Sequence, residues 1–248
     1  METLIPKIST VFKTLLRADF TTQWRNRRAV ILTLIVPVII LTTWKPFVAR
    51  FGGPFVLSNS ITIGLIAIGL MGYSTSIARD RDKGIFQRLR VAPISSWSIM
   101  TSRLLVQMTM ILMVTTAIFI AGSSYDQVTL TAPGYIVTYF TAIVCGALYL
   151  SLGQMIVGRI QNPETVNSTV RLVYFVFIMG GMYGQFSTDT QFHNVVQWSP
   201  YGTVKTILAA GMEPQQWNKN ASMALLATLG YTIVFTVLGI KWFKWTTK

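Results

Sequence analysis

The stretch IARDRDKGIFQRLRVAPISSW, residues 77–97, lies between two long apolar runs, 55–78 and 104–124. It concentrates charged side chains in a chain that has few of them. Only 12% of the 248 residues are charged, whereas 52% are hydrophobic. Soluble domains carry roughly 25% charged residues, so the composition excludes an ordinary soluble domain. The contrast predicts an integral membrane protein in which 77–97 joins two membrane-spanning helices outside the bilayer.

Six uncharged runs have about the length that a helix needs to cross a membrane, roughly 20 residues. They are 29–44, 55–78, 104–124, 134–158, 172–186 and 221–240. The first is short and contains Pro37, which is tolerated where neighbouring helices cover the carbonyl that proline leaves unpaired. The runs lack the alternation of apolar and polar residues that strands would require. The sequence therefore predicts an all-α membrane protein with six spans in a single domain, 1–248.

Basic residues gather on one side of these predicted spans. If the N-terminus is cytoplasmic, 17 of the 21 Lys and Arg residues lie on the inner side. The outer side then holds Lys45, Arg50, Lys205 and Lys219. Cytoplasmic loops carry such an excess, so we expect both termini in the cytoplasm of a cell with the protein in its plasma or inner membrane. The net charge of +13 follows from this asymmetry and from attraction to anionic lipid headgroups, and no nucleic-acid partner is expected.

Two further segments have helical character without the length or apolarity of a span. Within 1–27, apolar residues recur at three- and four-residue steps, which predicts an amphipathic helix along the inner membrane face. The segment 187–219 is too polar to span a membrane and too apolar for a solvated linker. Its stretch 195–211 suits one short helix that begins at Ser199-Pro200 and ends at Gly211. We expect a re-entrant or interfacial helical element there, on the outer side.

Motifs of catalytic, metal and nucleotide sites are missing from the sequence. There is no G-x-x-x-x-G-K-[ST] loop, no H-E-x-x-H or paired Cys/His spacing, and no G-x-S-x-G. His193 is the only histidine, and Cys145 is the only cysteine and falls inside a predicted span. The six apolar runs contain no acidic residue, which an ion-coupled pump usually needs. We therefore expect no catalytic residue, cofactor or metal in this chain, so the energy for any transport must come from elsewhere.

The segment 79–96 itself predicts a short helix with an apolar tip and a charged rim. Ile85 and Leu89 are four residues apart and share a helical face, with Phe86 nearby, whereas Arg88 points elsewhere. Such a helix suits a groove on a protein partner, because apolar anchors give affinity and rim charges fix the register. The alternative is that these charges only orient the span and touch lipid headgroups, which explains the Arg and Lys residues but leaves the apolar tip unexplained.

The stretch 78–97 resembles the cytosolic coupling segment of ABC-2-type transporter permeases. In that family an acidic–basic run is followed by Gly, an apolar–polar step to Arg-Leu, and Pro-Ile/Leu-Ser. The matching positions here are Arg79–Asp82, Gly84, Ile85, Arg88-Leu89 and Pro93-Ile94-Ser95. The amphipathic N-terminal segment, the six spans and WSPYGTVKTILAAG before the last span extend the resemblance over nearly the whole chain. The chain departs from the family at Asp82, commonly Glu, and at Ile85 and Gln87, commonly Thr and Glu.

The resemblance implies the permease subunit of an ABC exporter with type V architecture. Two such domains, identical or paired with a sister chain, would bind two copies of a separate P-loop ATPase, which holds the ATP and Mg. Closure of the ATPases would push on 79–95 and on the N-terminal helix, and would switch a pathway between the second and fifth spans. The implied coupling residues are Asp82, Gly84, Ile85, Phe86, Arg88, Leu89 and Pro93.

Candidate residues lining such a pathway lie on the second and fifth spans. On the second they are Asn59, Thr62, Tyr73 and Ser76, and on the fifth Tyr174, Phe177, Met179, Met182, Tyr183 and Gln185. Met and aromatic side chains adapt to varied apolar ligands, although the same residues also serve ordinary helix packing.

The compact form without a large outer domain most resembles antibiotic and drug exporters, which implies efflux of a hydrophobic or amphipathic substrate such as a drug, a natural product or a lipid-like molecule. Polysaccharide exporters share the architecture and stay open as an alternative. A non-transporting membrane scaffold or immunity protein would share the topology but need no ATPase. Half of a major facilitator transporter is disfavoured because the loop spacing from Gly72 does not fit, and a membrane-embedded enzyme because His, Cys and acidic residues are not clustered.

Overall fold

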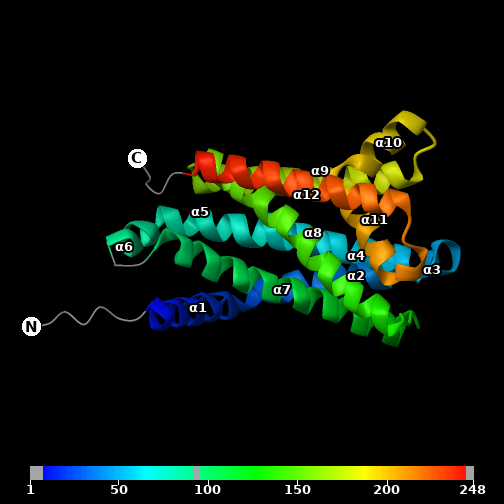
Figure 1. Ribbon diagram of the computed structural model, residues 1–248, viewed down its shortest axis with the longest axis horizontal. Helices are drawn as coiled ribbons and strands as arrows, with labels where there is room; N and C mark the ends of the chain where they lie inside the picture. Colours follow the sequence, from blue (N-terminus) through cyan, green and yellow to red (C-terminus); the bar gives the residue numbers. More distant parts are fainter. Residues whose placement is uncertain (1–7, 92–94, 244–248) are drawn as a thin grey trace, which may run out of the picture.

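The computed structural model describes residues 8–91 and 95–243, and over these residues it contains helices and no strand. Figure 1 shows a bundle of long helices that run roughly along one axis. In chain order the elements are α1 Ile8–Arg25, α2 Arg27–Thr43, α3 Lys45–Phe51, α4 Gly53–Ile66, the π-helix η1 Ala67–Ser74, α5 Thr75–Asp82, α6 Ile85–Val91, α7 Ser96–Tyr125, α8 Ala132–Arg159, α9 Pro163–Phe186, α10 Thr190–Trp198, α11 Pro200–Met212, the 3-10 turn η2 Pro214–Gln216 and α12 Lys219–Trp242.

Five of the predicted spans are single long apolar helices. They are Gly53–Asp82, which joins α4, η1 and α5, followed by Trp97–Tyr125, Ala132–Arg159, Pro163–Phe186 and Lys219–Trp242. The first predicted span is different, because Thr33–Thr43 and Lys45–Phe51 meet at a 58° bend and reach the length of a span only together. The prediction of an all-α membrane protein is confirmed.

The stretch after the first predicted span, residues 45–54, is helical although it contains two Pro and two Gly residues. Pro46 lies in the first turn of α3, where the N–H group that proline lacks would have had no helical partner. Gly52 then ends α3 with φ +85°, and Pro54 lies in the first turn of α4. The breakers of the sequence thus mark the ends of helices.

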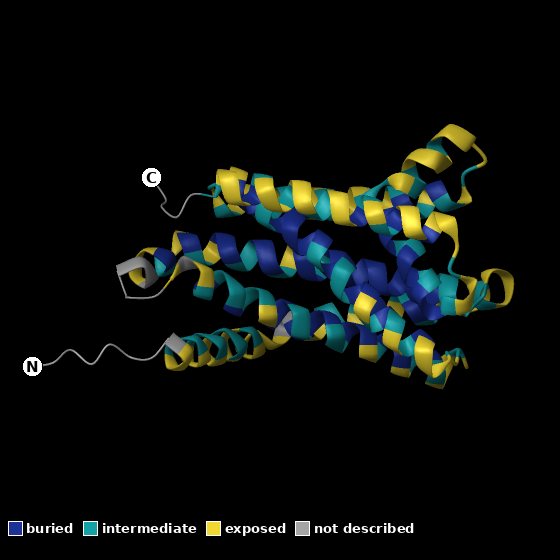
Figure 2. Ribbon diagram, viewed as in Figure 1, coloured by how far each residue is buried: buried dark blue, intermediate teal, exposed yellow. Residues whose placement is uncertain are grey.

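The second span is the centre of the bundle. In its apolar stretch of 18 residues, 78% of the residues are buried, whereas the corresponding stretches of α9 and α12 are only 22% and 17% buried. α8 packs against η1 and α12, and α2, α7 and α11 cover α4. Figure 2 shows this contrast as dark blue along the second span and yellow along much of α9 and α12. The surfaces of α9 and α12 are therefore among those most available to lipid or to another protein.

The π-helical turn η1 brings the second span into backbone contact with α8. Ser74 Oγ donates to the Gly69 carbonyl oxygen at 3.0 Å, five residues back along the chain. A Cβ on Gly69 would lie 2.5 Å from the carbonyl carbon of Tyr149, and one on Gly153 would lie 2.4 Å from the Gly69 carbonyl oxygen. Only glycine fits both positions, because any side chain would force the two helices apart.

The two segments expected to be helical but not spanning are both helical. α1 packs lengthwise against α7 (Figure 1).

The segment 187–219 contains two helices, α10 and α11, where the sequence suggested one. Ser199 caps α11 by accepting a hydrogen bond from Gly202 N, and the helix ends at Met212, one residue past Gly211. α11 packs against α4, α8 and α12; that it is re-entrant stays a prediction.

The contact between η1 and α8 can be tested by adding one methyl group. Gly69→Ala should lower the free energy of unfolding by about 1–3 kcal/mol, the usual cost of overpacking a core. Gly180→Ala in α9 is the matched control, because nothing lies within 4 Å of its added Cβ. That variant should be neutral or stabilised by roughly 0.5–1 kcal/mol. Thermal unfolding in detergent, followed by loss of the native size-exclusion peak, measures both. Equal midpoints for the two variants would contradict this packing.

Candidate functional site

The segment 79–91 forms two short helical pieces joined at Gly84. α5 ends at Asp82, and the Gly84 N–H donates to the Arg81 carbonyl oxygen at 3.0 Å. Gly84 has φ +66°, a left-handed conformation that glycine adopts without steric cost. The chain then turns into α6 (Ile85–Val91), whose Arg88 N–H donates back to the Gly84 carbonyl oxygen. A short helix thus projects from the end of the second span (Figure 1).

Arg81 fastens the start of this segment to the end of α8. Its side chain is 1% exposed. Nη1 donates to the Val157 carbonyl oxygen at 2.8 Å, and Nη2 donates to those of Ile160 and Gln161 at 2.6 and 3.0 Å. Carbonyl groups at a helix end have no partner inside the helix and carry partial negative charge. The guanidinium therefore satisfies three acceptors at once.

A second cation, Arg103 of α7, holds the segment from the other side. Its Nη1 forms an ion pair with Asp80 Oδ2 at 2.5 Å, and its guanidinium carbon lies 4.8 Å from the ring centroid of Phe86. Phe86 is fully buried and meets Phe243 edge-on, with the ring centroids 6.0 Å apart. Phe86 therefore anchors α6 to its own chain and is not at an exposed tip.

The remaining predicted coupling residues divide by exposure. Asp82 and Arg88 are exposed, and Ile85 is half-buried. Pro93 lies outside the described residues, and the placement of the Leu89 side chain is likewise not described. The surface open to a partner on the described part of α6 is therefore largely polar. That these residues bind an ATPase stays a prediction.

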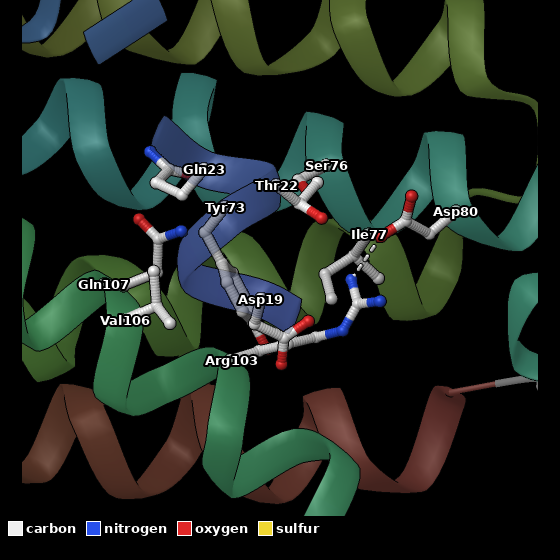
Figure 3. Close-up of a pocket in the computed structure, with 10 residues that line it drawn as sticks. All are labelled: Asp19, Thr22, Gln23, Tyr73, Ser76, Ile77, Asp80, Arg103, Val106 and Gln107. Atoms are coloured by element: carbon white, nitrogen blue, oxygen red, sulfur yellow. Dashed lines mark hydrogen bonds and ion pairs between the residues drawn. The ribbon is translucent and has the colours of Figure 1, made fainter. Parts of the chain in front are cut away.

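A polar cavity of about 30 Å³ lies beside the segment, between α1, the second span and α7. Figure 3 shows Asp19 and Asp80 on either side of the Arg103 guanidinium, with Tyr73 and Ser76 at the wall. Asp19 Oδ2 accepts a hydrogen bond from Ser102 Oγ at 2.5 Å. Burial raises the pKa of the Asp19 carboxyl, against the opposing effects of the Ser102 hydrogen bond and the Arg103 charge. Through Asp19 and Ser102, the N-terminal helix is attached to α7 one residue from the ion pair.

The predicted pathway residues fall into separate places. Tyr73 and Ser76 border the cavity, and the Tyr73 hydroxyl donates to Gln154 Oε1 at 2.8 Å. At the opposite end of the bundle, Asn59 and Gln185 are hydrogen-bonded to each other. Thr62 is buried and donates to the Ser58 carbonyl oxygen. On α9, Met179 and Tyr183 are exposed, whereas Tyr174, Phe177 and Met182 are half-buried. A pathway role for these residues stays a prediction.

Three side chains that organise the site were not singled out from the sequence: Asp19, Arg81 and Arg103. Asp19 offered a signal, because it is an acidic residue on an otherwise basic amphipathic helix. Arg81 offered none, since five Lys and Arg residues crowd positions 79–90 and only the position of the α8 terminus selects one of them. Among the described residues, no group of three or more His, Cys, Asp or Glu side chains could hold a metal ion.

The chain matches a known protein family over most of its length. A family model described as "ABC-2 type transporter" matches residues 10–203. The match runs from α1 through the second span, the projecting helix α6 and the long helices α7 to α9, and it reaches the first turn of α11. No curated protein matches the chain.

The Arg81 contacts predict a large effect of one substitution. Arg81→Met removes three hydrogen bonds to backbone carbonyl groups, one buried and two partly buried. It should lower the free energy of unfolding by about 3 kcal/mol, since hydrogen bonds to charged groups contribute roughly 1.5–3 kcal/mol each and methionine recovers part of the apolar packing. Arg79→Met is the matched control, because Arg79 is exposed two residues away and should change stability by less than about 0.5 kcal/mol. Thermal melts of both variants in detergent decide between a structural anchor and a surface charge.

The buried carboxyl of Asp19 predicts a dependence of stability on pH. A raised pKa means that the folded state favours the protonated form, so its contribution is fully present below the ordinary value of 3.8 and is lost as the pH rises through the folded-state pKa. Asp19→Asn imitates the protonated form. At pH 7 it should therefore unfold at the same temperature as the wild type or at a higher one.

This advantage of Asp19→Asn should shrink as the pH falls through the raised pKa, because the wild-type carboxyl then becomes neutral as well. Thermal midpoints of the two proteins at a series of pH values measure the difference. An Asn variant that is less stable than the wild type at pH 7 would show that the charged carboxylate is favoured in the folded state.

Proposed function

The chain belongs to the ABC-2 type transporter family and is thus a membrane-spanning permease subunit of an ABC transporter, and we propose that it forms the pathway of an ATP-driven exporter. The permease is not itself the catalytic subunit. A separate P-loop ATPase, two copies per complex, binds ATP and Mg and hydrolyses the ATP. A second permease chain, identical or a sister, completes the pathway, and both termini face the cytoplasm of the cell.

The observation that carries this proposal is the double attachment of the segment 79–91. Arg81 holds it to the end of α8, and Asp80 holds it to Arg103 of α7. A force on the exposed side of α6 is therefore transmitted to several spans through short polar contacts. Fixed contacts of this kind suit a helix that receives a push from a partner, whereas a loop that only orients a span has no need of them.

The exposed faces of the outer helices suit a second permease chain as well as lipid. α9 exposes Met179 and Tyr183, which are 58% and 70% exposed, although the Tyr183 ring also meets Phe192 of α10 edge-on. Flexible Met and amphipathic Tyr side chains adapt to apolar ligands of varied shape. This supports a hydrophobic or amphipathic substrate, such as a drug, an antibiotic or a lipid-like molecule, moving between the two permease halves.

Purification of the tagged chain from its native membrane in mild detergent, with mass spectrometry of what accompanies it, tests the proposal. We expect a stoichiometric protein with a Walker motif. A second six-span chain in the same preparation would mean a heterodimer, and its absence a homodimer. Recovery of the chain alone, repeated after gentle crosslinking, would contradict the proposal and favour a non-transporting scaffold or immunity protein.

Substitutions in the projecting helix should uncouple the ATPase without unfolding the permease. Gly84→Pro cannot adopt φ +66° because proline fixes φ near −65°, and Arg88→Glu reverses an exposed charge on α6. Both should lower permease-stimulated ATP hydrolysis by about tenfold or more, the effect of roughly 1.4 kcal/mol of lost interaction.

Lys219→Glu is the control for Arg88→Glu, because it reverses an exposed charge at the first residue of α12, and α12 begins at the end of the bundle opposite α6 (Figure 1). Membrane insertion of all three variants should match the wild type in a fractionation assay. Unchanged turnover in both the Gly84 and the Arg88 variants would remove α6 from the coupling pathway.

A further inference from the structure

At the end of the bundle opposite α6, the re-entrant helix α11 carries a cation that the chain satisfies only in part. Lys205 Nζ donates to Gln185 Oε1 at 2.6 Å and lies 4.3 Å from the ring centroid of Phe55. Within the described part of the chain, no Asp or Glu oxygen lies within ion-pair distance of it. An ammonium group has three donors, so this one retains capacity for a further acceptor.

A hydrogen-bond network from three helices sets the position of this ammonium. Gln185 Nε2 donates to Asn59 Oδ1 at 2.9 Å, which turns the other end of the Gln185 amide, Oε1, toward Lys205. The Tyr201 hydroxyl donates to the same Asn59 oxygen at 2.8 Å. Asn59 belongs to α4, Gln185 to α9, and Tyr201 and Lys205 to α11. The cation is therefore held in place by the second and fifth spans, to which the pathway was assigned by resemblance.

An exposed group of aromatic rings adjoins the ammonium. Phe55, which faces Lys205, stacks on Phe51 with the ring centroids 4.8 Å apart and on Trp44 at 6.2 Å. Phe186 meets Phe51 edge-on at 5.8 Å. Phe51 and Phe186 are 39% and 47% exposed. These residues, together with Phe47, form what we call the aromatic cluster: Trp44, Phe47, Phe51, Phe55 and Phe186.

A purely structural role would not require a cation at position 205. The contact with Gln185 Oε1 needs only one N–H donor, which a neutral glutamine side chain also supplies. Moving a charge out of water is costly unless an opposite charge or several acceptors compensate for it. The described residues supply one acceptor and one ring face to the half-buried Lys205, which leaves its ammonium able to pair with an anion.

We propose that Lys205 and the aromatic cluster form a binding subsite for an anionic amphipathic substrate. A phosphate, sulfonate or carboxylate group would pair with the Lys205 ammonium, since charge-assisted hydrogen bonds are about twice as strong as neutral ones. The apolar or aromatic body would lie on Phe51 and Phe186. The inference rests on the proposed export function and narrows its substrate class to molecules that carry a negative charge.

Two fluorescent probes that differ by a single charged group test the subsite. 8-Anilinonaphthalene-1-sulfonate is anionic, and N-phenyl-1-naphthylamine has the same ring system without the sulfonate. The full chain is placed in nanodiscs of zwitterionic phosphatidylcholine, and binding is measured by probe fluorescence after subtraction of empty nanodiscs. The wild type should bind the anionic probe about tenfold more tightly than the neutral one. Equal affinities for the two probes would overturn the proposal.

Variants separate the charge from the packing. Lys205→Gln should weaken binding of the anionic probe by about tenfold and leave binding of the neutral probe within about twofold of the wild type. Lys205→Arg keeps the positive charge and should therefore keep the tight binding of the anionic probe. Lys219→Gln, a change at an exposed lysine in the same end of the bundle, should alter neither. Phe186→Ala should weaken both probes alike. If Lys205→Gln weakens both probes equally, or if Arg does not restore the difference, Lys205 has only a structural role.

A lipid headgroup is the competing source of the same anion. Replacing part of the phosphatidylcholine with phosphatidylglycerol should leave the Lys205-dependent difference between the probes intact. Its disappearance would assign the site to bilayer lipid and overturn the substrate proposal. The measurement needs no ATPase, so its failure is distinct from failure of the export function, which is detected by purification of the chain without an ATPase.

Discussion

The structure depends on one buried guanidinium at the junction of the second span and the projecting helix. Arg81 is a cation placed where burial of charge is costly, and three carbonyl groups at the end of α8 compensate for it. Two of these groups, at Ile160 and Gln161, belong to the turn that leads into α9. Asn162 follows directly and caps α9 through its side-chain oxygen. The same contact therefore fixes the second span, the end of α8 and the start of α9.

The second span connects the two ends of the molecule that carry the functional proposals. Its last helix, α5, carries Arg81 with its contacts to the end of α8. Its first helix, α4, carries Asn59 in the network around Lys205. Between them lies the π-helical turn η1, where Gly69 contacts the backbone of α8. π-Helical turns are rare and often lie at functional positions. Here the turn brings the central helix into backbone contact with α8, between the α6 end and the Lys205 end of the bundle.

Much of the fold could be predicted from the sequence, because the bilayer makes strict demands on it. Uncharged runs located all the long helices, although α7 and α9 begin eight and nine residues before the runs that predicted them, and Ser199-Pro200 located the start of α11. The bend at Trp44 was not predictable, since it depends on how α3 packs on α4. The helicity of α3 was not predictable either, because Pro46 and Gly52 are residue types common in turns, and here they mark the two ends of a helix.

The site was less predictable than the fold, because its contacts join residues distant in sequence. Asn59 and Gln185 were both proposed for the pathway, but their hydrogen bond spans 126 positions, and nothing in the sequence indicates that they meet. Ile85 and Phe86 are neighbouring apolar residues, yet Phe86 is fully buried whereas Ile85 is only half-buried. The Phe86 ring packs against Arg103 and Phe243. Arg81 is likewise buried because the end of α8 lies beside it. Nothing in the local sequence distinguishes Arg81 from the other arginines of the segment.

If α6 receives a push from an ATPase as proposed, it should move as one unit with the end of α8, because Arg81 joins the preceding helix α5 to that end. Spin labels at Gln87 on α6 and Arg159 on α8, both exposed, in a Cys145→Ala background, measure this by pulsed electron paramagnetic resonance on the complex with its ATPase. The account predicts that the distance between the two labels is the same without nucleotide and with ATP bound, while the distance from each label to its counterpart in the second permease chain changes. A Gln87–Arg159 distance that shifts on ATP binding, with Arg159 stationary relative to its counterpart, would contradict the account.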